Sequence, residues 1–357
     1  MRRLTTGPST AARPVAPNQG LVCARKHSSA ICNGSVCIRG TMRTALTGAT
    51  LLSLLAILWL TEPPVGLALD EVTVSTTGAS IFFLPAEVAR QQGFFREQNL
   101  DIKYLVTRTE ADRAALASGN IDYTLRAGST MLSAARGLPV RVIFICTTKP
   151  FWALVVRPEA KDVKALKGKS LGVIGLLGSQ HIAAKVILKQ NGLDADKDVT
   201  YRVIQSGARL AAMQAGSLDA AMMDYGEAFR AKKAGFKILL NAADYYDALV
   251  SGVGVNLNKL RGQPEQVSRF LKAMVKAQAY MRENSEGTQA IMSSWLKVDK
   301  EMGAEIYQLS INNFTKNGSV EESNLNLLAD RMLAETGIKG VTASQLVDFA
   351  LLHQVLK

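Results

Sequence analysis

Residues 170–192 constrain the fold most, because they predict a buried strand that leads through a glycine-rich loop into a helix. Residues 171–174 form an apolar run that suits a buried strand, and Gly175 and Gly178 open the loop. Ser179 stands where a helix N-cap belongs, so the helix N-terminus can offer free N–H groups to an anion or a carbonyl. The GxxGxxG spacing differs from that of the nucleotide-binding loops. The loop is therefore either an ordinary structural turn or a ligand loop.

The same βαβαβαβ order occurs twice in the chain, about one hundred residues apart. Residues 78–80 correspond to residues 178–180, and the GxxD turn at 119–122 corresponds to the GxxD turn at 216–219. We expect a structural role for these turns, in which the glycine ends a helix and the aspartate bonds backbone N–H groups. The repeat predicts two α/β lobes, each a mostly parallel sheet flanked by helices. Ligands bind such sheets at the carboxyl ends of the strands.

Two extended segments, residues 151–158 and 248–256, connect the repeats. Two such crossings predict a two-segment hinge that lets the lobes close on a ligand. We expect residues 69–154 plus 252–357 to form lobe one and residues 155–251 to form lobe two. The helices predicted at the C-terminal end have apolar faces at 3.6-residue spacing, so they are expected to pack on lobe one.

The N-terminal part of the chain predicts export. An uncharged run over residues 44–61, apolar at its centre, follows the basic residue Arg43 and precedes small residues. This pattern is typical of a secretory signal peptide, here over residues 42–68 with cleavage after Ala68. Residues 1–41 are then a non-native or disordered extension. A retained membrane anchor is the alternative, because the run approaches the length of a membrane span.

Composition argues against several classes of function. Seven of the Lys and Arg residues that give the net charge of +12 lie in the first 68 residues, and the others are scattered. With aromatic residues at 6%, the chain lacks the basic, aromatic pattern of nucleic-acid-binding proteins. Cys146 is the single cysteine after the predicted signal, and His181 and His353 are expected on helix surfaces or in the core. We therefore predict no metal site.

Several short motifs, taken in order, resemble the periplasmic solute-binding proteins of ABC importers with the type 2 bilobal fold. These motifs are the two GxxD turns and residues 93–95, 137–140, 166–173, 191–193, 270–273 and 347–348. The resemblance covers about residues 72–350. The branch it resembles most holds alkanesulfonate, taurine, nitrate and thiamine-pyrimidine binders. It implies an α/β fold of two lobes that close on a ligand.

In that family the ligand lies between the lobes, which implies contacts from Thr77, Gly78, Ala79, Ser80, Arg126, Gly128, Ser129, Trp152, Gly178, Ser179 and Gln180. By the repeat, Met223 is the counterpart of Arg126, which places Asp224 and Tyr225 at the cleft as well. Arg126 and the helix caps would bind an anionic group. Asp224 would accept a hydrogen bond, while Trp152 and Tyr225 would stack on the ligand. Alternatively, Arg126 and Asp224 pair across the closed cleft.

We therefore predict a periplasmic, monomeric solute-binding component that delivers a small anionic or zwitterionic organic ligand to a membrane permease. Many relatives carry a proline-containing segment where this chain has residues 223–226, so the resemblance does not imply the identity of the ligand. We predict no enzyme activity, no catalytic residues and no cofactor, because neither a His/Cys cluster nor a carboxylate pair stands out. Two alternatives remain: a ligand-sensing module that feeds a receptor, and a same-fold enzyme of pyrimidine or menaquinone biosynthesis.

Overall fold

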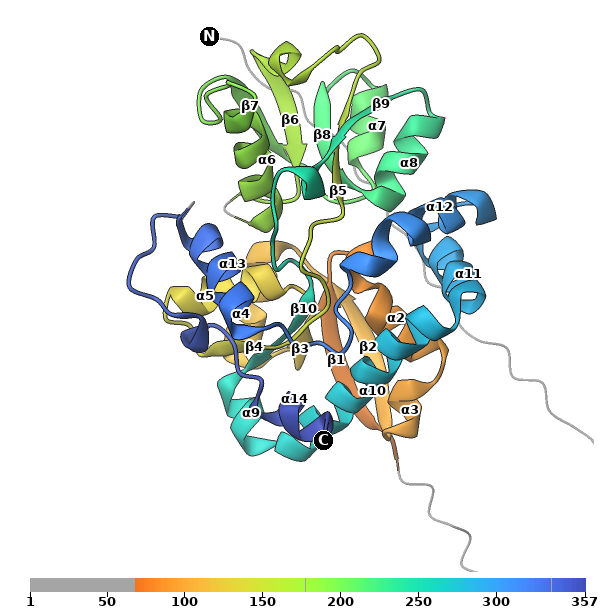
Figure 1. The fold of residues 1–357 in the computed structure, drawn as a ribbon, viewed down its shortest axis with the longest axis vertical. Helices are drawn as coiled ribbons and strands as arrows, with labels where there is room; N and C mark the ends of the chain where they lie inside the picture. The colour runs from red at the N-terminus through yellow and green to blue at the C-terminus, as the bar shows by residue number, and fades with distance from the viewer. Residues whose placement is uncertain (1–67, 177, 335) are drawn as a thin grey trace, which may run out of the picture. The chain divides into compact units, whose positions relative to one another are not determined.

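The computed structural model describes residues 68–176, 178–334 and 336–357. The predicted extension and all but the last residue of the predicted signal peptide lie outside the described residues. Two five-stranded sheets, each flanked by helices, form two lobes (Figure 1). The predicted two-lobed α/β fold is confirmed. Within the described ranges, no helix is long and apolar enough to cross a membrane.

The first sheet has the strand order β2-β1-β3-β10-β4. Strand β10 runs antiparallel to both of its neighbours, while the other four strands share one direction. The strands are β1 (Asp70–Thr76), β2 (Leu100–Val106), β3 (Tyr123–Thr124), β4 (Val140–Ile145) and β10 (Gly252–Asn256).

The second sheet repeats this arrangement, with the order β7-β6-β8-β5-β9 and β5 as its antiparallel strand. Its strands are β5 (Trp152–Val156), β6 (Lys169–Val173), β7 (Val199–Val203), β8 (Ala220–Asp224) and β9 (Lys237–Asn241). In both sheets the antiparallel strand lies between the third and fourth strands of the repeat. The equal order confirms the internal repeat predicted from the sequence.

The two predicted crossing segments contain strands of the sheets. Strand β5 pairs with β8 and β9, and β10 pairs with β3 and β4. Five residues of each crossing segment therefore belong to a sheet. The chain passes between the sheets at residues 146–151 and again at residues 242–251. The predicted lobe boundary at residue 154 falls inside β5, and the two-segment hinge remains a prediction.

The repeat helices flank the sheets, and the C-terminal helices add a further layer. The repeat elements are η1 (Ile81–Phe83), α2 (Leu84–Gln91), α3 (Phe94–Glu97), α4 (Thr109–Ser118), α5 (Ala127–Ala135), η2 (Val163–Leu166), α6 (Ser179–Gln190), α7 (Arg209–Gln214), α8 (Tyr225–Lys233) and η3 (Ala242–Asp244). The C-terminal elements are α9 (Leu257–Gly262), α10 (Pro264–Glu283), α11 (Ser285–Leu296), α12 (Lys300–Ser310), η4 (Ile311–Asn313), α13 (Glu322–Ala334), η5 (Ala343–Gln345) and α14 (Ala350–Val355).

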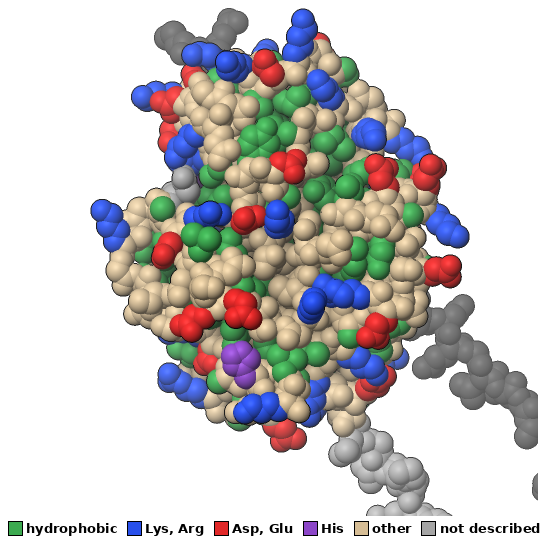
Figure 2. Space-filling view, viewed as in Figure 1, with side chains coloured by type: hydrophobic (Ala, Val, Ile, Leu, Met, Phe, Trp, Pro, Cys, Tyr) green, Lys and Arg blue, Asp and Glu red, His purple; other side chains and the backbone are tan. Residues whose placement is uncertain are grey.

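The C-terminal helices pack on the first lobe, as predicted. Helix α10 lies against α2 and α3, and its Phe270 stacks on Tyr123 of β3 at a centroid distance of 4.1 Å. They also reach the second lobe, where Arg230 of α8 donates a hydrogen bond to the carbonyl of Leu296. On the face shown in Figure 2, basic and acidic side chains of the described residues are interspersed over both lobes.

The two GxxD turns have the structural role that the sequence predicts. Their glycines adopt left-handed φ angles of 79° and 76°. Asp122 Oδ2 accepts a hydrogen bond from the Thr73 N–H at 2.7 Å, and Asp219 Oδ2 accepts one from the Ser170 N–H at 2.9 Å. Each aspartate therefore fixes the start of the third strand of its lobe against the first strand.

We expect Asp219→Ala to lower the free energy of unfolding by about 1–3 kcal/mol, because the variant loses hydrogen bonds from the Ser170 N–H and hydroxyl. These bonds hold the pKa of Asp219 below its ordinary value of 3.8. A lowered pKa stabilises the fold above the unfolded-state value, and this contribution is lost as the pH falls through the folded-state value. Urea unfolding should thus show a difference from the wild type that shrinks below about pH 4.

The matched control is Asp330→Ala, at an exposed position of α13. It should change the free energy of unfolding little, both at pH 7 and below about pH 4. An Asp219 variant as stable as this control at pH 7 would contradict the structural role of the turn.

Candidate functional site

A cavity of about 70 Å³ lies between the two lobes, at the carboxyl ends of the parallel strands. One water molecule needs about 10–15 Å³ on the same measure, so the cavity has room for several waters or one small polar group. Its lining comes from both lobes and consists of Thr77, Ser80, Phe82, Phe83, Thr109, Arg126, Ser129, Trp152, Ile174, Gly175, Gly178, Ser179, Gln180, Ser206, Arg209, Asp224 and Val250.

Most of the predicted ligand contacts line this cavity, namely Thr77, Ser80, Arg126, Ser129, Trp152, Gly178, Ser179, Gln180 and Asp224. Gly78, Ala79, Gly128 and Tyr225 are not among its lining residues. Tyr225 instead starts α8 with its ring 5.9 Å from that of Phe151, and burial raises the pKa of its hydroxyl to about 12. That the lining residues contact a ligand remains a prediction.

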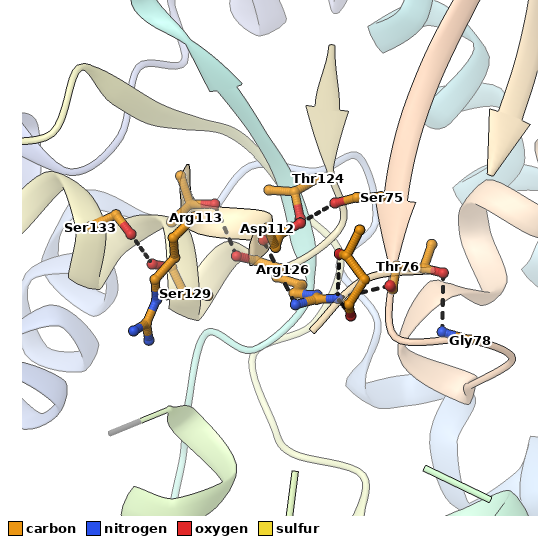
Figure 3. A network of polar contacts seen from close by, with 11 residues as sticks. Ser75, Thr76, Gly78, Asp112, Arg113, Thr124, Arg126, Ser129 and Ser133 are labelled. Atoms are coloured by element: carbon orange, nitrogen blue, oxygen red, sulfur yellow. Dashed lines mark hydrogen bonds and ion pairs between the residues drawn. The ribbon is translucent and has the colours of Figure 1, made fainter. Parts of the chain in front are cut away.

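Arg126 ties together the loops at the cleft edge of the first lobe (Figure 3). Its Nη2 donates hydrogen bonds to the carbonyl of Thr76 at 2.8 Å and to that of Thr107 at 2.6 Å. Its Nη1 lies 3.8 Å from Asp112 Oδ2. Since Thr76 ends β1, Thr107 follows β2 and Arg126 itself follows β3, one side chain joins the ends of three neighbouring strands.

Asp112, on α4, is the buried counter-charge of Arg126. It accepts hydrogen bonds from the hydroxyl of Ser75 and, at 3.0 Å, from that of Thr124. Burial lowers the pKa of the Arg126 guanidinium, and the Asp112 carboxylate acts in the opposite direction. An arginine stays charged at neutral pH all the same. Arg126 therefore presents a buried cation to the cavity.

In the second lobe, Arg209 bonds to several neighbouring segments in the way that Arg126 does in the first. The sequence analysis did not predict this residue. Its Nη1 donates to Gln180 Oε1 at 3.2 Å and to the Met222 carbonyl at 2.5 Å. Its Nη2 donates to Ser206 Oγ at 3.1 Å and pairs with Glu227. These partners follow β6 and β7, lie within β8 and stand in the first turn of α8, so Arg209 links three neighbouring strands.

The repeat relates Arg209 to a buried charge of the first lobe, but this relation becomes visible only once the structure shows that Asp112 is buried. Arg209 stands seven residues before Gly216, just as Asp112 stands seven residues before Gly119. Each lobe therefore has a buried charged residue at this position, although the sign is reversed. Seven further lining residues were missed, namely Phe82, Phe83, Thr109, Ile174, Gly175, Ser206 and Val250.

Asp224 lines the cavity from the second lobe and caps α8. Its Oδ1 accepts a hydrogen bond from the Glu227 N–H at 2.9 Å. Arg126 has its ion pair with Asp112 of its own lobe. The alternative in which Arg126 and Asp224 pair across the closed cleft stays a prediction.

Aromatic side chains form an apolar wall beside these charges. The ring of Phe82 lies 5.2 Å from the rings of both Phe151 and Trp152. Phe82 and Trp152 line the cavity, and the hydroxyl of Ser251 fixes the carbonyl of Phe82. The cavity of about 70 Å³ is too small for a flat organic ligand, so this wall could take one only after the cleft widens.

The lobes meet at two glycines beside the cavity. A Cβ atom added to Gly128 of α5 would overlap the hydroxyl of Ser179, the first residue of α6, and would lie 2.9 Å from the Leu249 carbonyl oxygen. A Cβ atom at Gly175 would lie 3.5 Å from Thr109 Oγ1, which is an ordinary contact. The absence of a side chain at Gly128 thus lets the N-termini of two helices approach each other.

The cavity's chemistry comes from a few polar side chains in the part of the chain that the structure describes. Within that part, the His, Cys, Asp and Glu side chains form no group of three or more that could hold a metal ion. Burial raises the pKa of the Cys146 thiol to about 12, and burial lowers the pKa of His181. The cavity itself offers donors, one carboxylate and aromatic surface, which suits the binding of a small polar molecule.

The NMT1/THI5-like family model matches residues 81–288 of this chain. A 4-amino-5-hydroxymethyl-2-methylpyrimidine phosphate synthase of Saccharomyces cerevisiae is 28% identical over 218 residues, which are 56% of this chain and 63% of the synthase. The riboflavin-binding protein RibY of Chloroflexus aurantiacus is 26% identical over 220 residues, 59% of this chain and 62% of that protein. The chain thus spans less than two thirds of these curated relatives.

A solved structure shows the fold independently. The alkanesulfonate-binding protein SsuA of Xanthomonas axonopodis, bound to MOPS, superposes with a TM-score of 0.63 at 14% identity. The match covers 78% of this chain and 98% of that protein. The fold is therefore that of the periplasmic binding proteins, which confirms the resemblance drawn from the motifs.

The curated relatives require one correction. The prediction that the chain is not an enzyme is contradicted, because relatives at about 28% identity are named as synthases. The binding-protein fold by itself does not separate the two activities. The matched region covers more than half of the 357 residues and includes nearly all of the cavity lining. The chain belongs to the NMT1/THI5-like family.

Proposed function

We propose that this protein is the periplasmic solute-binding component of an ABC importer, and that it captures a small anionic or zwitterionic organic molecule between its lobes. The observation that carries this proposal is the cavity between the lobes, in which buried charged side chains of both lobes face one small space. A signal peptide over residues 42–68 would export the protein, which would act as a monomer and deliver its ligand to a membrane permease.

Opposite charges at the cavity support a ligand with two kinds of polar group. Arg126 offers N–H donors from the first lobe, whereas Asp224 offers carboxylate oxygen from the second. A carboxylate, sulfonate or phosphate would bind the donors, and an amine, amide or hydroxyl would bind Asp224. The names of the curated relatives, a riboflavin-binding protein and pyrimidine phosphate synthases, favour a nitrogen heterocycle for the flat part on the aromatic wall.

A second candidate is an enzyme of the pyrimidine phosphate synthase type, which the names of the yeast relatives favour. The two functions differ in what happens to the ligand. A transport protein releases the molecule that it captured, while a synthase releases a different one. A sensor that feeds a receptor would also release its ligand unchanged, and would differ from the transport protein by the membrane partner with which it co-purifies.

Identification of the co-purified ligand tests the function. Protein purified from the periplasm is denatured, and the released molecules are identified by mass spectrometry. We expect one small acid or zwitterion. The same molecule should be recovered unchanged after prolonged incubation with fresh protein. Its conversion into a product would support the synthase and overturn the transport role.

Closure of the lobes generates a second prediction. Gly128→Ala should weaken binding of the recovered ligand by about 1–3 kcal/mol, because the added methyl group overlaps Ser179 and opposes the approach of the lobes. Calorimetry would measure the affinity. Small-angle scattering should show a smaller ligand-induced decrease in the radius of gyration than in the wild type.

Gly262→Ala is the matched control, since it is also a helical glycine and a Cβ atom there meets nothing within 4 Å. The control should bind and close like the wild type. If Gly128→Ala did the same, the contact between α5 and α6 would not be part of the closed, ligand-bound state.

A further inference from the structure

Two buried arginines that line the cavity, one from each lobe, have N–H groups without a hydrogen-bond partner. These groups are Nε and Nη1 of Arg126 and Nε of Arg209. Both side chains line the cavity, and they are 7% and 1% exposed. A buried donor without an acceptor is costly, so such groups in a folded protein call for a partner.

Both guanidinium groups are held in place by their own lobes. Nη2 of Arg126 is occupied by the carbonyls of Thr76 and Thr107, and both terminal nitrogens of Arg209 are occupied by partners in the second lobe. Neither group can turn toward a new partner without breaking these bonds. Their free N–H groups are therefore preorganised for a molecule that enters the cavity.

The charges around the two arginines indicate which kind of ligand would bind their free N–H groups. Asp112 is the counter-charge of Arg126, and Glu227 is that of Arg209. Asp224 is the remaining carboxylate at the cavity, with one oxygen bonded to the N–H of Glu227. A ligand with acceptor oxygens can supply the partners that these N–H groups lack. The N-termini of α5 and α6, which meet beside the cavity, favour a negative charge in addition.

We propose that Arg126 and Arg209 bind the same oxyanion group of the ligand, one from each lobe. This inference rests on the proposed ligand cleft and names the class of group that it takes, namely a carboxylate, sulfonate or phosphate. The anion supplies acceptors to both arginines at once and so links the lobes. Arg209 becomes a specificity-determining residue that favours acids over their neutral analogues.

A double-mutant cycle tests the shared anion, with inorganic sulfate as the probe. We expect sulfate to bind the full-length protein at constant ionic strength in calorimetry. Arg126→Lys and Arg209→Lys should each weaken sulfate binding by roughly 10-fold or more, because lysine keeps the charge but lacks the Nε–H group. The double variant should lose less than the product of the two single losses, since both residues contact one anion.

This non-additivity separates binding from a merely structural role. The partners that each arginine holds lie in its own lobe, so purely structural losses in the two lobes would multiply. Arg202→Lys, at an exposed position of β7 in the second lobe, is the matched control and should bind sulfate like the wild type. Thermal unfolding of each variant checks that it is folded, and Arg209→Gln extends the series with the charge removed.

Two results would overturn the shared anion site. Losses that multiply in the double variant would mean that the arginines do not contact the same group. Failure of the folded wild type to bind sulfate, and equally phosphate, would mean that the cavity does not take an oxyanion. Neither result decides the proposed transport function. That function is tested separately, by whether a ligand is recovered unchanged from the periplasmic protein.

Discussion

The site depends on one buried arginine in each lobe that bonds to the ends of neighbouring strands. Parallel strands of a sheet end with loops at the same edge, and such loops have no ladder of hydrogen bonds to fix them. Arg126 and Arg209 supply these bonds from a single guanidinium each. Burying a cation is expensive unless it is paired, and Asp112 and Glu227 supply that pairing. The same arrangement leaves N–H donors unpaired on two residues that line the cavity.

The sequence predicts the features of this protein that depend on local residues. The GxxD turns are recognisable because a left-handed glycine and a short acidic side chain are needed within four residues, and their repetition predicted two similar lobes. Arg126 was predicted because it follows the strand of one such turn. The same repeat placed Asp224 at the cleft, where it lines the cavity.

Features that depend on distant residues could not be predicted in this way. Arg209 looks like a charged residue on a helix surface until its partners Gln180 and Glu227, which are 29 and 18 positions away, are brought beside it. The apolar segment around β5 is equally compatible with a crossing and with a strand, and its pairing with β8 and β9 decides between them. Gly128 was expected to contact the ligand, whereas the close approach of Ser179 gives it a role between the lobes.

The C-terminal helices limit how the lobes can move. Besides the two connecting stretches, a third link joins the lobes where α8 meets the chain around Leu296, through Arg230 and through the ion pair of Lys233 with Asp299. Gly226, in the first turn of α8, also lies against the side chain of Leu296. A rotation that opens the cavity must either break these contacts or turn about an axis close to them. If the lobes turned about such an axis, the carboxylate of Asp224, which caps this same helix, would lie near it, and loops farther away would move more.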